Sequence, residues 1–119
     1  MGINADYGMW SAYRALWWLD AELEAVSLSA AQDICSECET QDCLHACPAN
    51  ALVAGAMPDL RKCADFRLSA ESACADTCVA RMACPVAAEQ RYTPEQMAYH
   101  YDLARSQIHL FSTRAQQES

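Results

Sequence analysis

Eight cysteines are the residues of this 119-residue chain whose type and spacing could do chemistry, and they form two sets of four. Each set ends in a Cys-Pro pair, the first at Pro48 and the second at Pro85. The first set consists of Cys35, Cys38, Cys43 and Cys47, and the second of Cys63, Cys74, Cys78 and Cys84. Because thiolates bind zinc and iron–sulfur clusters, two sets of four predict two four-thiolate metal sites.

Disulfides, zinc and iron–sulfur clusters are the three uses of eight cysteines to be weighed. Residues 1–6 lack the basic and apolar regions of a signal peptide, so we expect a cytoplasmic protein, in which disulfides are rare. Zinc knuckles pair nearby cysteines, as at Cys35/Cys38 and Cys74/Cys78, but they give the Cys-Pro endings no role. The sequence therefore favours clusters, and a zinc-stapled interaction domain remains an alternative.

Two clusters impose a rule on which cysteines act together. Three cysteines on one tight loop reach three irons of a four-iron cluster, and the fourth ligand has to come from elsewhere. In two-cluster ferredoxins the last cysteine of each Cys-Pro motif therefore binds the other cluster. Applied here, the rule assigns one cluster to Cys35, Cys38, Cys43 and Cys84, and the other to Cys47, Cys63, Cys74 and Cys78.

Helical patterns surround the cysteines and are expected to position them. Apolar residues three or four positions apart predict a helix over about residues 9–26 and another over 94–111, the latter beginning at a capping box of Thr93 and Gln96. Residues 33–86 between them form the expected metal-binding core. We expect one mainly α domain (α+β with little strand), in which two long helices flank a small ferredoxin-like core.

Shorter elements are expected within that core. Asp42 is placed to cap a helical turn over residues 43–47, and a helix is expected to begin at Pro58-Asp59. The apolar residues 51–54 predict a short strand.

A third helix is expected to carry cysteines of the second set. Ser69 is a candidate N-cap for it, and the helix is expected to end near Cys84. Cys74 and Cys78 are four positions apart, so both thiols would share one face of that helix.

Charge and hydropathy limit the partners. The chain has 16 acidic and 8 basic side chains and a net charge of -8, which argues against nucleic acid as a partner. An acidic surface suits docking to a basic patch on a redox partner, although it also simply confers solubility. Arg14, Asp20 and Glu22 interrupt the one apolar stretch, so we expect no membrane span.

The two Cys-Pro sets resemble those of bacterial two-[4Fe–4S] ferredoxins. The looser second set is more similar to the ferredoxin-like domain of epoxyqueuosine reductases and reductive dehalogenases, where a lone cysteine, matched here by Cys63, stands between the first motif and the final group. The resemblance covers about residues 35–85 and implies electron relay. In those enzymes the relay feeds a cobalamin held by a separate domain, for which this chain is too short. The gaps of four, three and five residues depart from the family's usual spacing.

The sequence thus predicts an electron-transfer protein with two [4Fe–4S] clusters and no catalytic residues of its own. The alternative function is a ferredoxin-like module of a larger cobalamin- or flavin-dependent reductase. The tryptophans of the first helix, Trp10, Trp17 and Trp18, motivate it, because they could meet a second copy or a missing domain. Side chains near Cys84 are candidate donors to cluster sulfurs: Arg81, Arg91 and Tyr92.

Overall fold

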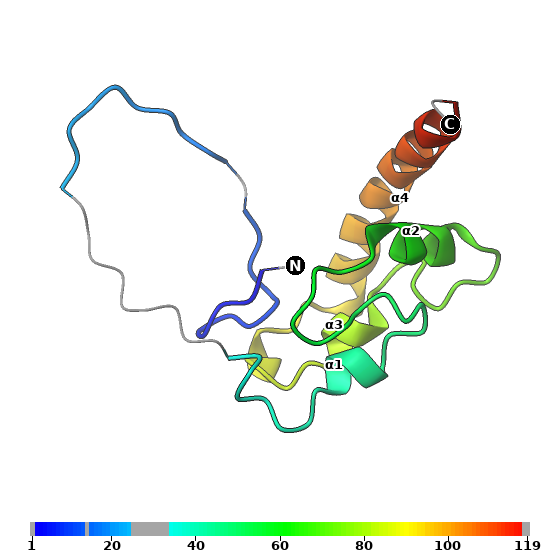
Figure 1. Ribbon diagram of the computed structural model, residues 1–119, viewed down its shortest axis with the longest axis horizontal. Coiled ribbons are helices and arrows are strands. Elements are labelled where there is room, and N and C mark those ends of the chain that lie inside the picture. The colour runs from blue at the N-terminus through cyan, green and yellow to red at the C-terminus, as the bar shows by residue number, and fades with distance from the viewer. Residues whose placement is uncertain (1, 14, 25–33, 118–119) are drawn as a thin grey trace.

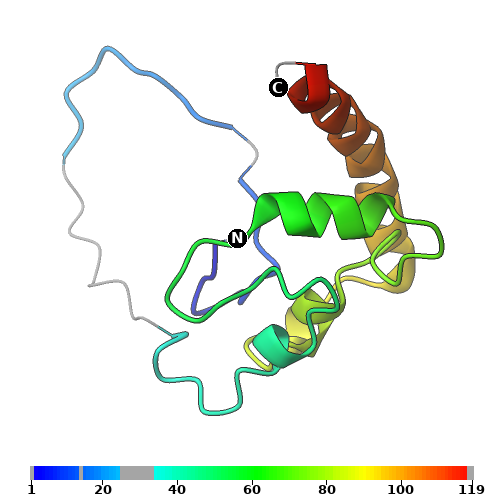
Figure 2. The same ribbon diagram turned by 45° about the vertical axis from the view of Figure 1, so that its right-hand side comes forward.

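The computed structural model describes residues 2–13, 15–24 and 34–117 (Figure 1). In chain order its elements are α1 (Asp42–His45), α2 (Leu60–Leu68), α3 (Val79–Ala83), the 3-10 helix η1 (Ala88–Gln90) and α4 (Pro94–Gln117). α1 packs against α3, and α2 packs against α4 (Figure 2). The cysteines lie in these helices, in the loops that connect them and in the segment before α1.

Strand structure is almost absent from the described residues, where one isolated antiparallel bridge joins Asn4 and Gly8. The expectation of a mainly α fold with little strand is therefore confirmed. The strand predicted over residues 51–54 is wrong, because this segment has no neighbouring strand in the described part of the chain with which to pair. The Ala51 carbonyl instead accepts a hydrogen bond of 2.8 Å from the Asp59 N–H, which closes a loop before α2.

The N-terminal helix predicted over residues 9–26 is wrong wherever the structure describes it, because residues 9–13 and 15–24 are not helical. Residues 25 and 26, like residue 33 of the expected core, lie outside the described part. Side chains of the expected apolar face are exposed to solvent, Leu16 by 95% and Leu23 by 72%. A helix draws most of its stability from packing its apolar face, and the described residues provide no cover for this one.

The N-terminal residues are held to the rest of the protein by Trp10, which is only 4% exposed. Its ring lies 5.3 Å from that of Tyr92, and the Arg81 guanidinium stacks 4.4 Å from its centre. Gly8 has a φ of 55° and a Cβ there would collide with the Val86 carbonyl oxygen, so the position requires glycine. This turn therefore packs directly beside the Cys84-Pro85 segment.

α2 begins where the sequence predicts and ends at a residue that was expected to start the next helix. Asp59 Oδ1 accepts a hydrogen bond of 3.0 Å from the Lys62 N–H, which caps the first turn. Ser69, the expected N-cap of a third helix, is the C-cap of α2, and its hydroxyl donates to the Phe66 carbonyl at 2.7 Å. A serine hydroxyl can satisfy either end of a helix, which is why the type of residue did not decide the direction.

The third helix is much shorter than predicted. α3 spans Val79–Ala83, with Cys78 and Cys84 as its caps, and Cys74 lies in the turns before it. Glu71 has a positive φ of 55°, a conformation that an α-helix does not allow. Cys74 and Cys78 are therefore placed by turns and a cap, and not by a shared helical face.

α4 confirms the helix expected over 94–111 and extends it to Gln117. Its first turn carries Met97, which is 1% exposed and is the most deeply buried large side chain of the described residues. No helix in the described ranges is both long and apolar enough to cross a bilayer.

The capping box of α4 provides a small, measurable test of the fold. The Gln96 N–H donates to Thr93 Oγ1 at 3.3 Å, and Gln96 Oε1 accepts from the Thr93 N–H at 2.9 Å. We expect Thr93→Ala to lower the free energy of unfolding by about 1 kcal/mol, measured by denaturant titration. Thr113→Ala on the same helix is the control, because its hydroxyl only donates back to the His109 carbonyl. Equal losses in the two variants would contradict a specific capping role.

Candidate metal centre

Four cysteines line a pocket of about 450 Å³ that we call site 1. The described residues around it are apolar or neutral and include Ile3 and Met9 from the N-terminal turn. Cys35 is exposed, whereas Cys84 is buried. The thiols of site 1 come from both sequence sets: Cys35, Cys38, Cys43 and Cys84.

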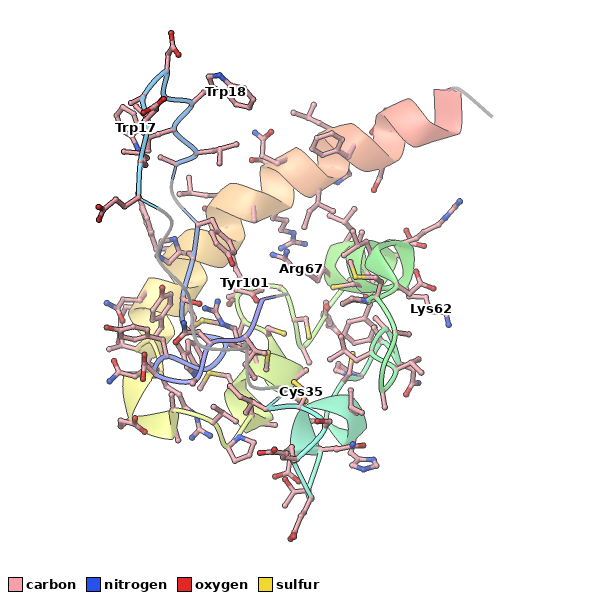
Figure 3. All side chains as sticks on the ribbon, turned by 60° about the vertical axis from the view of Figure 1, so that its left-hand side comes forward. Trp17, Trp18, Cys35, Lys62, Arg67 and Tyr101 are labelled. Carbon is pink, nitrogen blue, oxygen red and sulfur yellow. The ribbon has the colours of Figure 1, made fainter. Side chains whose placement is uncertain are left out.

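The other four cysteines line a smaller pocket of about 120 Å³ that we call site 2. It lies against α2 and α4, and its wall includes Arg67 and Tyr101 (Figure 3). Leu52 and Pro58 line both pockets, so a thin apolar wall separates the two sites. The thiols of site 2 are Cys47, Cys63, Cys74 and Cys78. The structure thus brings together the same two groups of four that the cross-over rule assigned.

The packed pair α1 and α3 explains this interleaving. Cys43 lies in α1 and faces site 1, while Cys47, two residues beyond α1, lines site 2. Cys78 caps the start of α3 at site 2, while Cys84 caps its end at site 1. The two short helices therefore run in opposite directions between the sites. Each helix, together with its flanking residues, supplies one thiol to site 1 and one to site 2. Cys84 has an extended ψ of 126°, as expected before a proline.

Hydrogen bonds from the backbone and from hydroxyls reach several of the sulfurs. The Arg81 N–H donates to Cys78 Sγ at 3.4 Å, and the Thr40 hydroxyl lies 3.9 Å from Cys38 Sγ. Backbone groups at Leu44 and Val79 bond to Cys43 and Cys74 in the same way. Such bonds favour the thiolate, which is the form that binds metals.

The thiols of each site also perturb one another. Burial raises the pKa of Cys43, and the neighbouring Cys84, Cys35 and Cys38 raise it further. Burial likewise raises the pKa of Cys63 and of Cys74, with added repulsion from Cys78 and Cys47. The interacting cysteines are members of the same site in every case.

These raised pKa values predict how the metal-free protein titrates. Burial favours the neutral thiol, so the three groups stabilise the metal-free fold below their ordinary pKa of 9.0 and stop doing so as the pH rises through the raised values. We expect alkylation of Cys43, Cys63 and Cys74, followed by mass spectrometry of their peptides, to reach half its maximal rate above pH 9.0. The control is the same chain in denaturant, and identical profiles in the two conditions would contradict the prediction.

Two side chains that the sequence analysis did not single out complete site 2. Arg67 is 9% exposed, and its guanidinium donates to the Cys74 carbonyl at 3.3 Å and to the Tyr101 carbonyl at 3.1 Å. The Tyr101 hydroxyl is hydrogen-bonded to the Cys78 sulfur. Arg67 follows Cys63 by four positions on α2, and this one-turn spacing was the available signal. Tyr101 could not be separated from the apolar stripe of α4.

The side chains expected to donate to cluster sulfurs near Cys84 have other described contacts. The Arg91 guanidinium donates to the Cys84 carbonyl at 3.1 Å, and Arg81 and Tyr92 stack with Trp10. Arg81 reaches a sulfur through its backbone N–H only, so far as its hydrogen bonds are described. These residues support the cysteine backbone and anchor the N-terminal turn.

Among residues 2–13, 15–24 and 34–117, no three Cys, His, Asp or Glu side chains converge closely enough to hold one metal ion. The thiols of each site are instead distributed around a pocket. Comparisons of the chain with protein-family models, with curated proteins and with solved structures found no match.

Proposed function

We propose that this protein carries one-electron equivalents on two [4Fe–4S] clusters, one held by the thiols of site 1 and one by those of site 2. The observation that carries the proposal is the interleaved grouping of all eight cysteines around two adjoining pockets. Interleaving is the arrangement that two-cluster ferredoxins use, and it arises here from α1 and α3 running in opposite senses.

The pockets fit a polyatomic group better than a single ion. A water molecule needs only about 10–15 Å³ of cavity volume, so even the smaller pocket, at about 120 Å³, has room for a group of several atoms. Four thiolates on one zinc would lie only about 3.8 Å apart, as follows from a tetrahedron with Zn–S bonds of about 2.3 Å. Thiols spread around a pocket match a cluster, which separates its ligands by a cage of iron and sulfide.

Charge provides a second test of the fit at site 2. Arg67 is buried, and its two described hydrogen bonds go to backbone carbonyls. A buried cation is costly unless an anion compensates it. A group held by four thiolates is such an anion, so the residues of site 2 suit it.

Each side chain then has a defined task. A bound cluster supplies a centre that gains and loses one electron without proton chemistry. The cysteines hold the irons, the apolar walls with Leu52 and Pro58 limit access of water, and the backbone N–H of Arg81 stabilises a ligand sulfur. The net charge of -8 favours a redox partner with a basic surface.

The test is iron and acid-labile sulfide per chain in protein purified without oxygen. About eight of each, with a brown colour that bleaches on reduction, is expected for two clusters. One or two zinc atoms per chain with no sulfide would overturn the proposal and leave the zinc-stapled interaction domain.

A second candidate function is an electron-relay module that docks on a partner chain of a larger reductase. The exposure of Trp17 and Trp18 favours it, and Figure 3 shows both on the N-terminal segment, apart from the helices. Apolar exposure of this kind usually marks a contact surface. Asp20 and Glu22 lie in the same segment, so the matching groove would have a basic rim.

Tryptophan fluorescence tests this candidate directly. Acrylamide is expected to quench the emission of Trp17 and Trp18 in the loaded protein, while Trp10 stays protected. The Trp10→Phe variant, which retains only the two exposed tryptophans, separates the signals. If its emission is protected from acrylamide at low protein concentration, the segment already packs within the chain and the candidate loses its support.

A further inference from the structure

The buried Arg67 occupies a fixed position in the wall of site 2. Its Nε and Nη2 atoms donate to two carbonyls on different elements, and its guanidinium lies 4.4 Å from the centre of the Tyr101 ring. Within the described residues the one salt bridge joins Lys62 and Asp59, so no carboxylate there neutralises Arg67. The full positive charge is therefore directed at site 2 in surroundings where water screens it little.

Tyr101 acts at the same site from α4. Its ring lies over the Arg67 guanidinium, and its hydroxyl is hydrogen-bonded to the sulfur of Cys78. Figure 3 shows Arg67 and Tyr101 lying side by side between α2 and α4.

Site 1 has no counterpart to the buried Arg67 among the described residues of its wall, although the Thr40 hydroxyl lies 3.9 Å from Cys38 Sγ. None of them carries a charge, and most are aliphatic, such as Ile34, Leu44 and Val53. Arg91 is exposed, bonds to the Cys84 carbonyl and does not line the pocket. The two sites thus present equal sets of thiols in unequal electrostatic surroundings.

We propose that Arg67 and Tyr101 hold the reduction potential of site 2 above that of site 1, so that an electron entering the protein comes to rest at site 2. The inference rests on the proposed function, because it assigns an order to two clusters. Reduction adds a negative charge, and a nearby buried cation stabilises the reduced form more than the oxidised one. A hydrogen bond to a ligand sulfur acts in the same direction by withdrawing charge from the thiolate.

Greater access of water to site 1 works against this order, because hydration also stabilises added charge. Cys35 is exposed while Cys74 is buried, so site 1 is the wetter of the two. Mobile water reorients to solvate either oxidation state of a cluster. The fixed positive charge of Arg67, in contrast, always stabilises the reduced state over the oxidised one. We therefore expect the charge to decide the order.

The experiment is an anaerobic redox titration of the loaded full-length chain, followed by electron paramagnetic resonance. Two midpoints are expected in the unaltered protein. Arg67→Met should lower the higher midpoint by about 59 mV, which corresponds to a tenfold change in the ratio of reduced to oxidised site 2. Tyr101→Phe should lower the same midpoint by a smaller amount, and Arg67→Lys should restore most of the loss because the charge is kept.

Matched controls separate tuning from general damage. Arg61→Met removes an exposed arginine from α2, and Tyr99→Phe changes an exposed tyrosine of α4. Neither residue lines site 1 or site 2. Both should leave the two midpoints unchanged. Iron and sulfide content should stay the same in every variant. A substitution that only damaged the structure would lower that content.

Three results would overturn the inference. If Arg67→Met and Tyr101→Phe hold both clusters with unchanged midpoints, the pair does not tune site 2, although the proposed function stands. The same holds if only the lower midpoint moves, because the order of the sites is then reversed. If the unaltered chain holds no iron and sulfide, the proposed function fails and this inference fails with it. If the Arg67→Met protein does not bind a cluster at site 2, the midpoint of the nearly isosteric Tyr101→Phe variant decides the question.

Discussion

A protein with Cys35 and Cys84 both replaced by alanine is expected to lose one metal centre completely and keep the other intact. These residues are 49 positions apart (84 minus 35) and belong to different sequence sets, yet they line the same pocket. Removing two of four ligands leaves a cluster without an adequate anchor. Iron and sulfide should fall to about half of the unaltered content, or about four of each per chain. The spectrum that remains should be that of site 2.

The matched control is Cys35→Ala with Cys47→Ala, two residues of a single Cys-Pro set that lie in different sites. This pair should damage both centres, so the loss should exceed one half. A sequential arrangement, in which each set holds its own metal, predicts the reverse order of losses. The comparison therefore tests the interleaving itself, whether the metal is iron or zinc, and equal losses in the two double variants would contradict it.

The grouping of the thiols was predictable because it depends on a rule about reach along the chain. A loop of three cysteines cannot surround a four-iron cluster, and that limit holds whatever the local secondary structure is. The prediction that Cys74 and Cys78 share a helical face was wrong, yet both line site 2. The grouping of cysteines around a pocket can therefore be inferred more safely from their spacing than the secondary structure that carries them.

The N-terminal helix shows the opposite case. The periodic apolar residues over 9–26 are a local pattern, but helix formation depends on whether another surface covers them. In the described structure Trp10 is drawn into a stack with Arg81 and Tyr92, and the residues after it extend away (Figure 1). A sequence pattern reports the preference of a segment for an apolar neighbour, and it does not report whether the chain provides one.

The asymmetry between the sites was also beyond the sequence. Arg67 and Arg61 are both arginines of α2, and only the packing of α2 against α4 places the first in a pocket and leaves the second in solvent. Tyr101 fits the apolar stripe of α4 and yet has a polar task at Cys78. Such roles follow from tertiary contacts, which a single sequence shows only as one-turn spacings.

Loss of the metal centres is expected to destabilise this protein more than any single substitution. The buried apolar side chains in the described residues are few, and two of them are cysteines: Trp10, Ala51, Cys74, Ala80, Cys84 and Met97. A core of this size contributes little stability, and small domains of this kind commonly depend on metals. If the proposed clusters are bound, their binding energy is therefore expected to form a large part of the folding energy.

We expect protein with bound clusters to melt at least about 20 °C above protein stripped of iron by mild oxidation and a chelator. Cluster binding should contribute on the order of 5 kcal/mol or more to stability. Each kcal/mol shifts the melting midpoint of a small domain by about 4–8 °C. Thermal denaturation followed by circular dichroism measures the difference. Protein incubated without oxidant or chelator is the control, and reconstitution with iron and sulfide should restore the higher midpoint. A stripped protein that melts within a few degrees of the loaded one would show that the apolar core alone stabilises the fold. The cysteine sites would then serve no structural purpose.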